Sequence, residues 1–202
     1  MLNQLLSIVA VLVISTAANA AIIEYSDTDL ASGFSVNKDG LNLTTTTADG
    51  DLSLIGFGQY TGLYIGVNDA NGTYAMNFSQ SITSIEIEFD ALSNTGGQVP
   101  ETIYGFATSN GPVTIGYTNQ FGTIFDGTTI TSTENDGQGI ITFSGAAFTS
   151  FFFTHNQDPN QNGFVIERVK VVTGDVNVVP LPASGILLAA ALAGLGLRRR
   201  RS

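Results

Sequence analysis

Apolar and polar residues alternate along much of this chain, in short runs separated by turn residues. Ile85, Ile87 and Phe89, for example, alternate with polar residues in the segment TSIEIEFD. A period of two places successive side chains on opposite faces of an extended chain, so this pattern predicts a half-buried antiparallel strand. Further runs of this kind lie at 41–47, 51–57, 63–67, 73–78, 102–107, 112–117, 139–143, 149–154 and 164–172.

The turns between these runs are rich in Asn, Asp and Gly. Such clusters occupy 37–40, 68–72, 94–97, 109–112 and 134–137. Short strands at intervals of about 8 to 12 residues, joined by turns of this composition, are typical of sandwiches and barrels. No amphipathic helix pattern of useful length interrupts them. The sequence therefore predicts an all-β fold, a single jelly-roll-like antiparallel β-sandwich that spans residues 21–178.

The last run changes phase partway along. Phe164 and Ile166 have one parity, whereas Val169 and Val171 have the other. One extra residue between the two pairs, a β-bulge, would return all four side chains to the same face. The stretch 162–171 also resembles the last strand of exported jelly-roll modules, many of which bind carbohydrate.

The first twenty residues have the layout of a secretory signal peptide. An apolar run from Leu5 to Ile14 is followed by small residues that end in Ala18-Asn19-Ala20. The A-x-A sequence formed by Ala18 and Ala20 predicts cleavage after Ala20 and export through the inner membrane. The segment before the apolar run contains no Lys or Arg, which departs from the usual pattern.

Residues 179–202 contain three parts in order: a proline-bracketed motif, an uncharged apolar segment at 185–197 and a final cluster of arginines. The apolar segment would form a helix of about 20 Å, short of the roughly 30 Å hydrocarbon core of a bilayer. Arginines do not follow such a segment into lipid, so they should stay on the cytoplasmic side and leave the main domain outside. The motif consists of Val179, Pro180, Leu181, Pro182 and Ala183, and the cluster of Arg198, Arg199, Arg200 and Arg201.

This tripartite tail resembles the PEP-CTERM class of protein-sorting signals, and residues 179–183 match its VPLPA-CTERM variant. The resemblance implies processing by an exosortase, a membrane-embedded transpeptidase-like enzyme of Gram-negative bacteria that make exopolysaccharide and biofilm. In that class the short motif is the region of recognition and cleavage. Two prolines keep the motif extended, which suits engagement by a protease. The C-terminal transmembrane helix would then hold the chain in the inner membrane only transiently, before the protein reaches the cell surface or the extracellular space.

The charge of the chain is unevenly distributed. Residues 21–178 contain all 17 acidic side chains but only three basic ones, Lys38, Arg168 and Lys170, which gives a formal charge of −14. An anionic domain without basic clusters argues against nucleic acid as a partner. It also disfavours adhesion to anionic polymers unless divalent cations bridge the two. The absence of cysteine excludes disulfides, thiolate metal sites and thiol nucleophiles.

Asp158, Asn160 and Asn162 have the spacing of a calcium-binding loop. With Gly163 they satisfy the D-x-[DN]-x-[DN]-G pattern, which places side-chain oxygens around one point. The twelfth position, however, is Val169 rather than Glu, so the segment is not an EF-hand. A polar turn without any cofactor is the simpler interpretation. An oxygen-ligated Ca²⁺ site is the alternative.

Three residues could support hydrolytic chemistry. His155 is the only histidine and could act as a general base, although no G-x-S-x-G nucleophile motif accompanies it. Glu86 and Glu88 share one strand face at a separation of about 6.5 to 7 Å, near that of the carboxylate pairs of glycoside hydrolases. A strand-end histidine and solvent-facing carboxylates explain the same residues without catalysis.

The sequence as a whole predicts a non-catalytic protein that is exported, sorted by an exosortase and associated with exopolysaccharide or biofilm. A Ca²⁺-dependent carbohydrate-binding module is one alternative, and a hydrolase that uses His155 or the pair of Glu86 and Glu88 is another.

Six tyrosines could stack on sugar rings or fill half-buried strand positions.

Overall fold

The structure, a computed structural model, describes residues 20–54, 59–67, 71–95, 98–159 and 161–174 of the 202-residue chain. The predicted signal peptide before Ala20, Asn160, the sorting motif at 179–183 and the arginines at 198–201 lie outside the described residues. Among the residues that are described, no helix has the length and hydropathy needed to cross a membrane.

The alternating pattern does form strands, and the described part of the chain is all-β, as predicted. It contains thirteen antiparallel-paired strands and one short helix. The strands are β1 (Ile22–Tyr25), β2 (Ser35–Lys38), β3 (Leu41–Thr47), β4 (Leu52–Ser53), β5 (Leu63–Ile65), β6 (Gly72–Leu92), β7 (Thr102–Thr108), β8 (Gly111–Pro112), β9 (Gly116–Phe121), β10 (Thr123–Phe125), β11 (Ile130–Ser132), β12 (Gly137–Asn156) and β13 (Phe164–Thr173), and the helix is α1 (Asp27–Leu30).

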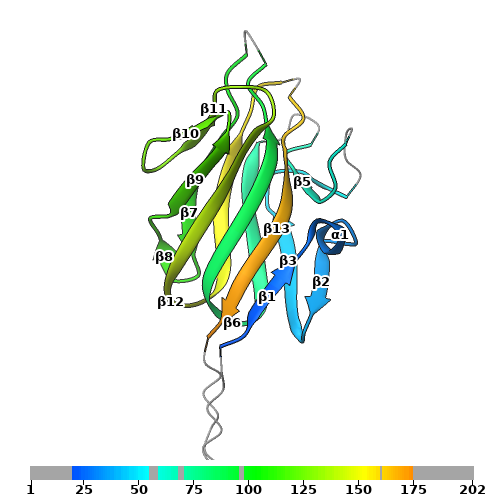
Figure 1. The fold of residues 1–202 in the computed structure, drawn as a ribbon, viewed down its shortest axis with the longest axis vertical. Helices are drawn as coiled ribbons and strands as arrows, with labels where there is room; N and C mark the ends of the chain where they lie inside the picture. The colour runs from blue at the N-terminus through cyan, green and yellow to red at the C-terminus, as the bar shows by residue number, and fades with distance from the viewer. Residues whose placement is uncertain (1–19, 55–58, 68–70, 96–97, 160, 175–202) are drawn as a thin grey trace, which may run out of the picture. The chain divides into compact units, whose positions relative to one another are not determined.

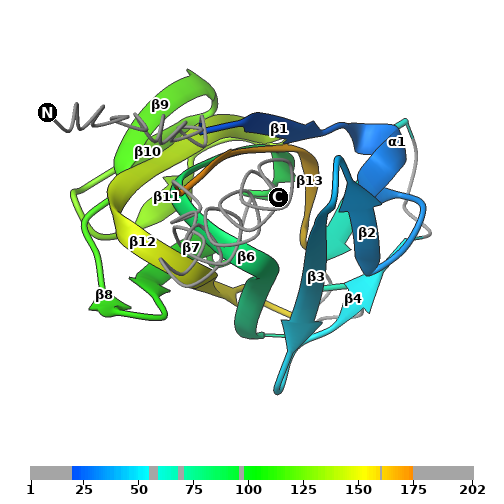
Figure 2. The same ribbon diagram turned by 90° about the horizontal axis from the view of Figure 1, so that it is seen from below.

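Two long strands, β6 and β12, pair antiparallel and bend together, so that they join two layers (Figures 1 and 2). The second half of β6 pairs with β13 and with the first half of β12, and these strands form one layer with β1, β5 and β9. The first half of β6 pairs with β3 and with the second half of β12, which extend into β2 and β7 in the other layer. The register of this strand pair shifts between Ser144 and Phe148, where the chain passes from one layer to the other.

Aromatic side chains fill the space between the layers. The ring centroid of Phe164 lies 5.8 Å from that of Phe89 in its own layer and 6.2 Å from that of Phe153 in the opposite layer. Phe153 in turn stacks on Tyr74 at 5.6 Å. All four side chains are buried, so one continuous apolar core holds the layers together.

The expected bulge in β13 is confirmed. The register of β13 against β6 shifts between Ile166 and Arg168. As a result Phe164, Ile166, Val169 and Val171 all belong to the main core. The extra residue therefore restores a single apolar face, as the change of phase in the sequence requires.

The two ends of the described domain lie side by side. The Thr173 N–H donates to the Ala21 carbonyl oxygen, and the Ala21 N–H donates to Thr173 Oγ1, each at 2.9 Å. The Gly174 N–H also donates to the carbonyl oxygen of Ser81 on β6, near its bend. We call this end the terminal pole. The segments that join β6 to β7 and β12 to β13 lie at the opposite end (Figure 1), which we call the loop pole.

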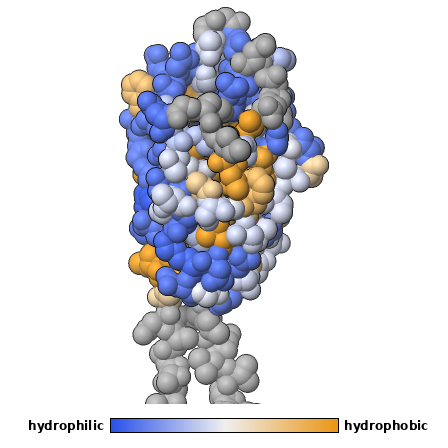
Figure 3. Space-filling view, turned by 90° about the vertical axis from the view of Figure 1, so that its right-hand side faces the viewer, coloured by the Kyte–Doolittle hydropathy of each residue, from blue (hydrophilic) through white to orange (hydrophobic). Residues whose placement is uncertain are grey.

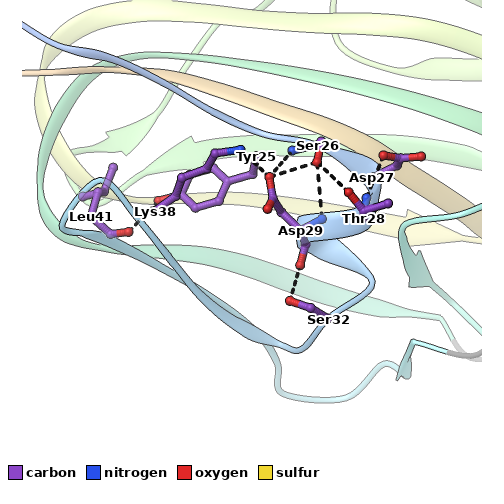
Figure 4. Close-up of polar contacts among 8 residues, drawn as sticks. All are labelled: Tyr25, Ser26, Asp27, Thr28, Asp29, Ser32, Lys38 and Leu41. Atoms are coloured by element: carbon purple, nitrogen blue, oxygen red, sulfur yellow. Dashed lines mark hydrogen bonds and ion pairs between the residues drawn. The ribbon is translucent and has the colours of Figure 1, made fainter.

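Helix α1 is capped by its own side chains. The side of the domain that carries α1 is hydrophilic at its margin and has an apolar area near the centre (Figure 3). Ser26 Oγ accepts from the Asp29 N–H, and Asp29 Oδ2 accepts from the Ser26 N–H. Asp29 also pairs with Lys38 of β2 (Figure 4). The hydrogen bond from Lys38, followed by those from Ser26, lowers the pKa of Asp29 to about 2.

Asp29 should make the stability of the domain depend on pH in the acid range. Its pKa falls from 3.8 to about 2 on folding, so its contribution is complete above the unfolded value and is lost as the pH falls through the folded value. The side chains of Lys38 and Asp29 are 37% and 30% exposed, which limits the contribution to about 1 kcal/mol or less. Urea unfolding between about pH 5 and about pH 2 should show a shallower pH dependence in Asp29→Asn than in the native chain.

Lys38→Met tests the same ion pair from its other side chain. It removes the partner that contributes most to the shift, so it should reproduce part of the Asp29→Asn effect. It should add almost nothing when the two changes are combined. An unaltered acid slope in Asp29→Asn would contradict the assignment.

Candidate functional site

The predicted calcium loop lies at the loop pole, and its contacts are those of a turn. Asp158 Oδ2 accepts from the Val99 N–H at 2.7 Å, and Gln161 Oε1 accepts from the Asp158 N–H at 2.7 Å. The Gln161 N–H returns to the Asp158 carbonyl oxygen at 3.2 Å. These bonds close the loop and tie it to the segment between β6 and β7. Within the described residues, no three or more His, Cys, Asp or Glu side chains are grouped so that they could hold a metal ion.

His155 is buried at the end of β12, beside an acidic residue that the sequence did not single out. Its Nε2 lies 3.9 Å from Glu101 Oε2, and both side chains are inaccessible to solvent. That distance is too long for a hydrogen bond, and neither ring nitrogen has a hydrogen-bond partner in the described part of the chain. The imidazole packs edge-on against Phe164, with ring centroids 5.1 Å apart. A general base acts on a nucleophile within hydrogen-bond reach, and His155 contacts none among the described residues.

Arg168 of β13 bridges Glu86 and Glu88 on the outer face of β6. Its Nη2 lies 3.0 Å from Glu86 Oε1, and its Nε donates to Glu88 Oε2 at 2.8 Å. Partial burial opposes ionisation of Glu88, but hydrogen bonds from Gln120 and Arg168 outweigh burial and lower the pKa of Glu88. One guanidinium group therefore pairs with both carboxylates and keeps Glu88 in its ionised form.

The six tyrosines differ in their accessibility. Four are buried in or packed against the cores: Tyr25, Tyr64, Tyr74 and Tyr117. Tyr104 is 39% exposed on β7. Tyr60 is partly exposed at the loop pole. Tyr117 is also partly exposed, so Tyr60, Tyr104 and Tyr117 are the tyrosines that reach solvent.

A polar cavity of about 140 Å³ opens at the loop pole. Its walls come from four segments: the approach to β5, the segment between β6 and β7, the turn before β12, and the loop between β12 and β13. Asn162 of the predicted calcium loop takes part in this lining. The lining residues include Tyr60, Ala91, Ser93, Asp136, Gln161 and Asn162.

Local backbone geometry brings two of these walls into position. The register of β12 against β6 shifts between Gly137 and Gly139. Opposite this bulge Ala91 adopts a φ of 66°, and Asp136 in the preceding turn adopts a φ of 62°. Asp tolerates the left-handed region better than most residues, which suits the turn that the sequence predicts at 134–137.

Glu101 joins two walls of the cavity from beneath. Its Oε2 accepts from the Ser93 N–H at 2.9 Å, and its Oε1 accepts from the Gly163 N–H at 3.2 Å. Ser93 and Gly163 both line the cavity but belong to different segments. One buried carboxylate therefore fixes the segment between β6 and β7 against the loop between β12 and β13.

The cavity has a negative electrostatic character. Burial raises the pKa of Tyr60, and the carboxylates of Asp136 and Asp90 raise it further. A hydrogen bond with Gln59 has the opposite effect but is smaller than the effect of burial. Burial also raises the pKa of Asp90, and the negative charges of Asp136 and Glu88 act in the same direction. Anionic ligands are therefore disfavoured here.

Sequence reasoning missed Glu101 and most of the cavity lining. Glu101 follows Pro100 just before a predicted strand and belongs to no motif. The available hint was that the turn clusters at 94–97 and 134–137 and the loop at 158–163 could lie at one end of the sheet. No protein-family model, curated protein or solved structure matches the chain at a significant level. The functional argument therefore depends on the residues themselves.

Proposed function

We propose that this chain is a non-catalytic surface or extracellular-matrix protein of a Gram-negative bacterium, exported and then sorted by an exosortase. The observation that carries the proposal is the order of parts in the sequence. A segment with the layout of a signal peptide precedes one domain, and residues 179–183, an apolar segment and the cluster Arg198–Arg201 follow it. Association with exopolysaccharide or biofilm is the role that this sorting route implies.

The arrangement of the domain ends supports this proposal. Ala21 directly follows the proposed signal cleavage site, and Thr173 precedes the motif by only a few residues. The two residues are hydrogen-bonded to each other at the terminal pole.

We also propose that the two layers form a jelly-roll-like sandwich without a catalytic centre. The bent pair of strands β6 and β12, which contributes to both layers, supports the sandwich. Two contacts support the absence of catalysis: Arg168 occupies both Glu86 and Glu88, and His155 lies in the core against Phe164.

The sorting proposal can be tested by expressing the chain in a Gram-negative host with and without its exosortase. Deletion of residues 179–202 should prevent processing, because it removes the motif and the apolar segment together. Pro180→Ala combined with Pro182→Ala should sharply reduce processing, because the motif can then join a helix instead of remaining extended. The mass of the mature protein, measured by mass spectrometry in membrane and extracellular fractions, reports the outcome.

Pro112→Ala is the matched control, because it replaces an exposed proline in β8, outside the motif. It should be processed like the native chain. The sorting proposal is wrong if the mature mass and its distribution stay the same after the motif prolines are replaced, or do not depend on the exosortase.

A further inference from the structure

Gln161 leaves an unused hydrogen-bond donor in the wall of the cavity. The residue is 2% exposed, and its Oε1 accepts from the Asp158 N–H. Its Nε2 has no hydrogen-bond partner among the described residues. A buried amide donor is normally paired, because an unpaired one loses its hydrogen bonds to water without compensation. Gln161 lines the cavity, and a ligand that reached this covered donor would have to offer it an acceptor atom.

Asp136 sets the opposite requirement in the same cavity. Its carboxylate lines the cavity and, when ionised, can only accept hydrogen bonds. A metal cation would satisfy Asp136 but leave the Gln161 donor unused, and an anion would be repelled by Asp136 and Asp90. A neutral ligand with several hydroxyl groups meets both requirements, because each hydroxyl can donate and accept.

The size of the cavity and its aromatic wall narrow the class of ligand. Its volume of about 140 Å³ is close to the roughly 150 Å³ that accommodates one benzene ring. Tyr60 borders this space and packs on a small apolar cluster of Tyr64, Ala91 and Val165. A supported aromatic ring beside convergent polar groups suits the apolar face of a single sugar ring.

From this juxtaposition we propose that the loop pole binds one neutral sugar unit, a hexose or a pentose, without Ca²⁺. Gln161 Nε2 donates to one ligand hydroxyl, Asp136 accepts from another, and Tyr60 packs against the ring. Ser93 and Asn162 supply further polar groups in the wall. The inference rests on the proposed association with exopolysaccharide for its biological setting, and it adds the site and the chemical group that is recognised.

The test uses the full chain, purified in a detergent that has no sugar headgroup. NMR titrations with glucose, galactose, mannose, xylose and glucuronate measure binding, each with Ca²⁺ and with EDTA. At least one neutral sugar should bind with a dissociation constant of about 1 mM, as expected for so small a ligand. The affinity should be the same in EDTA, and glucuronate should bind at least about tenfold more weakly because of Asp136 and Asp90.

Two conservative variants test the assigned contacts. Gln161→Glu keeps an acceptor for the Asp158 N–H but removes the amide donor, and Asp136→Asn keeps a residue that tolerates positive φ but removes the carboxylate. Each should weaken binding about tenfold or more, as should Tyr60→Ala. Gln80→Glu, near the terminal pole, and Tyr104→Ala, on β7, are the matched controls and should bind like the native chain. Circular dichroism confirms that each variant is folded.

Three results would overturn the inference. They are the absence of binding by any of the four neutral sugars at about 20 mM, binding that requires Ca²⁺, and equal losses in the controls and in the cavity variants. Binding by the purified protein does not depend on its sorting. A failure here would therefore leave the export proposal intact, and unaltered processing of the motif variants would leave this proposal intact.

Discussion

Replacing Gly163 with Ala should destabilise the domain by at least about 3 kcal/mol. Gly163 has a φ of 75°, a conformation that costs a residue with a Cβ about 1 to 2 kcal/mol by itself. A Cβ at this position would also overlap the carbonyl oxygen of Ile65 and lie 2.9 Å from the carbonyl group of Gly66. Both are backbone atoms, so the overlap can be relieved only by separating the start of β13 from β5.

Gly40 provides the matched control for this prediction. It has a similar φ of 82°, but a Cβ there would meet nothing within 4 Å. Gly40→Ala should therefore cost only the conformational part, about 1 to 2 kcal/mol. Urea unfolding followed by circular dichroism measures both variants. Equal losses in the two would show that the contact with Ile65 does not determine the cost at Gly163.

The alternating pattern predicted most strands that bury one face. The run at 112–117 is an exception, because it contains buried Ile115 but only its ends belong to strands, β8 and β9. The run at 41–47 coincides with β3, and the change of phase in 164–172 correctly predicted the bulge of β13. Both predictions depend on short-range information, because burial of every second side chain is visible in the sequence itself.

The bent strand pair of β6 and β12 and the edge strands were not predictable in the same way. The sequence predicted 73–78 and the segment around Ile87 as separate strands, but both belong to β6, which continues through the polar residues at 79–81. Among the edge strands, β2 has no fully buried residue and β9 is almost entirely accessible. β2 pairs with the next strand, β3, across the turn at Asp39 and Gly40, whereas β9 pairs with β12, further along the chain. Neither strand has the buried face that alternation reports.

The candidate site, too, was predictable only where a local sequence pattern exists. The spacing from Asp158 to Gly163 directed attention to the correct loop, because Asn and Asp at those positions serve turn chemistry as well as metal ligation. The role of Glu101 could not be predicted, since its acceptors meet the N–H groups of Ser93 and Gly163 only after β6, β12 and β13 have been assembled. A cavity lined by four segments has no spacing that a motif could capture.

Phe164→Ala should lower the free energy of unfolding by about 3 to 5 kcal/mol, the usual cost of removing a buried phenylalanine. Phe164 is 2% exposed and contacts aromatic rings on both layers, including Phe89 and Phe153. It also packs against His155 beneath the loop pole. Truncation would therefore leave a cavity between the layers, and the rigid rings around it cannot collapse to fill it.

Phe121→Ala is the control, because Phe121 is 53% exposed and its removal should cost less than about 1 kcal/mol. Phe164→Leu should restore roughly half of the loss seen in Phe164→Ala, since the larger side chain refills part of the cavity. At Gly163, by contrast, every side chain begins with the same Cβ, so no larger residue can relieve the overlap with Ile65. If Phe164→Ala lost no more stability than Phe121→Ala in urea unfolding, the layers would not depend on this aromatic contact. Recovery at residue 164 without recovery at residue 163 would show that these neighbouring residues stabilise the loop pole differently, one by filling the core and the other by allowing two strands to approach.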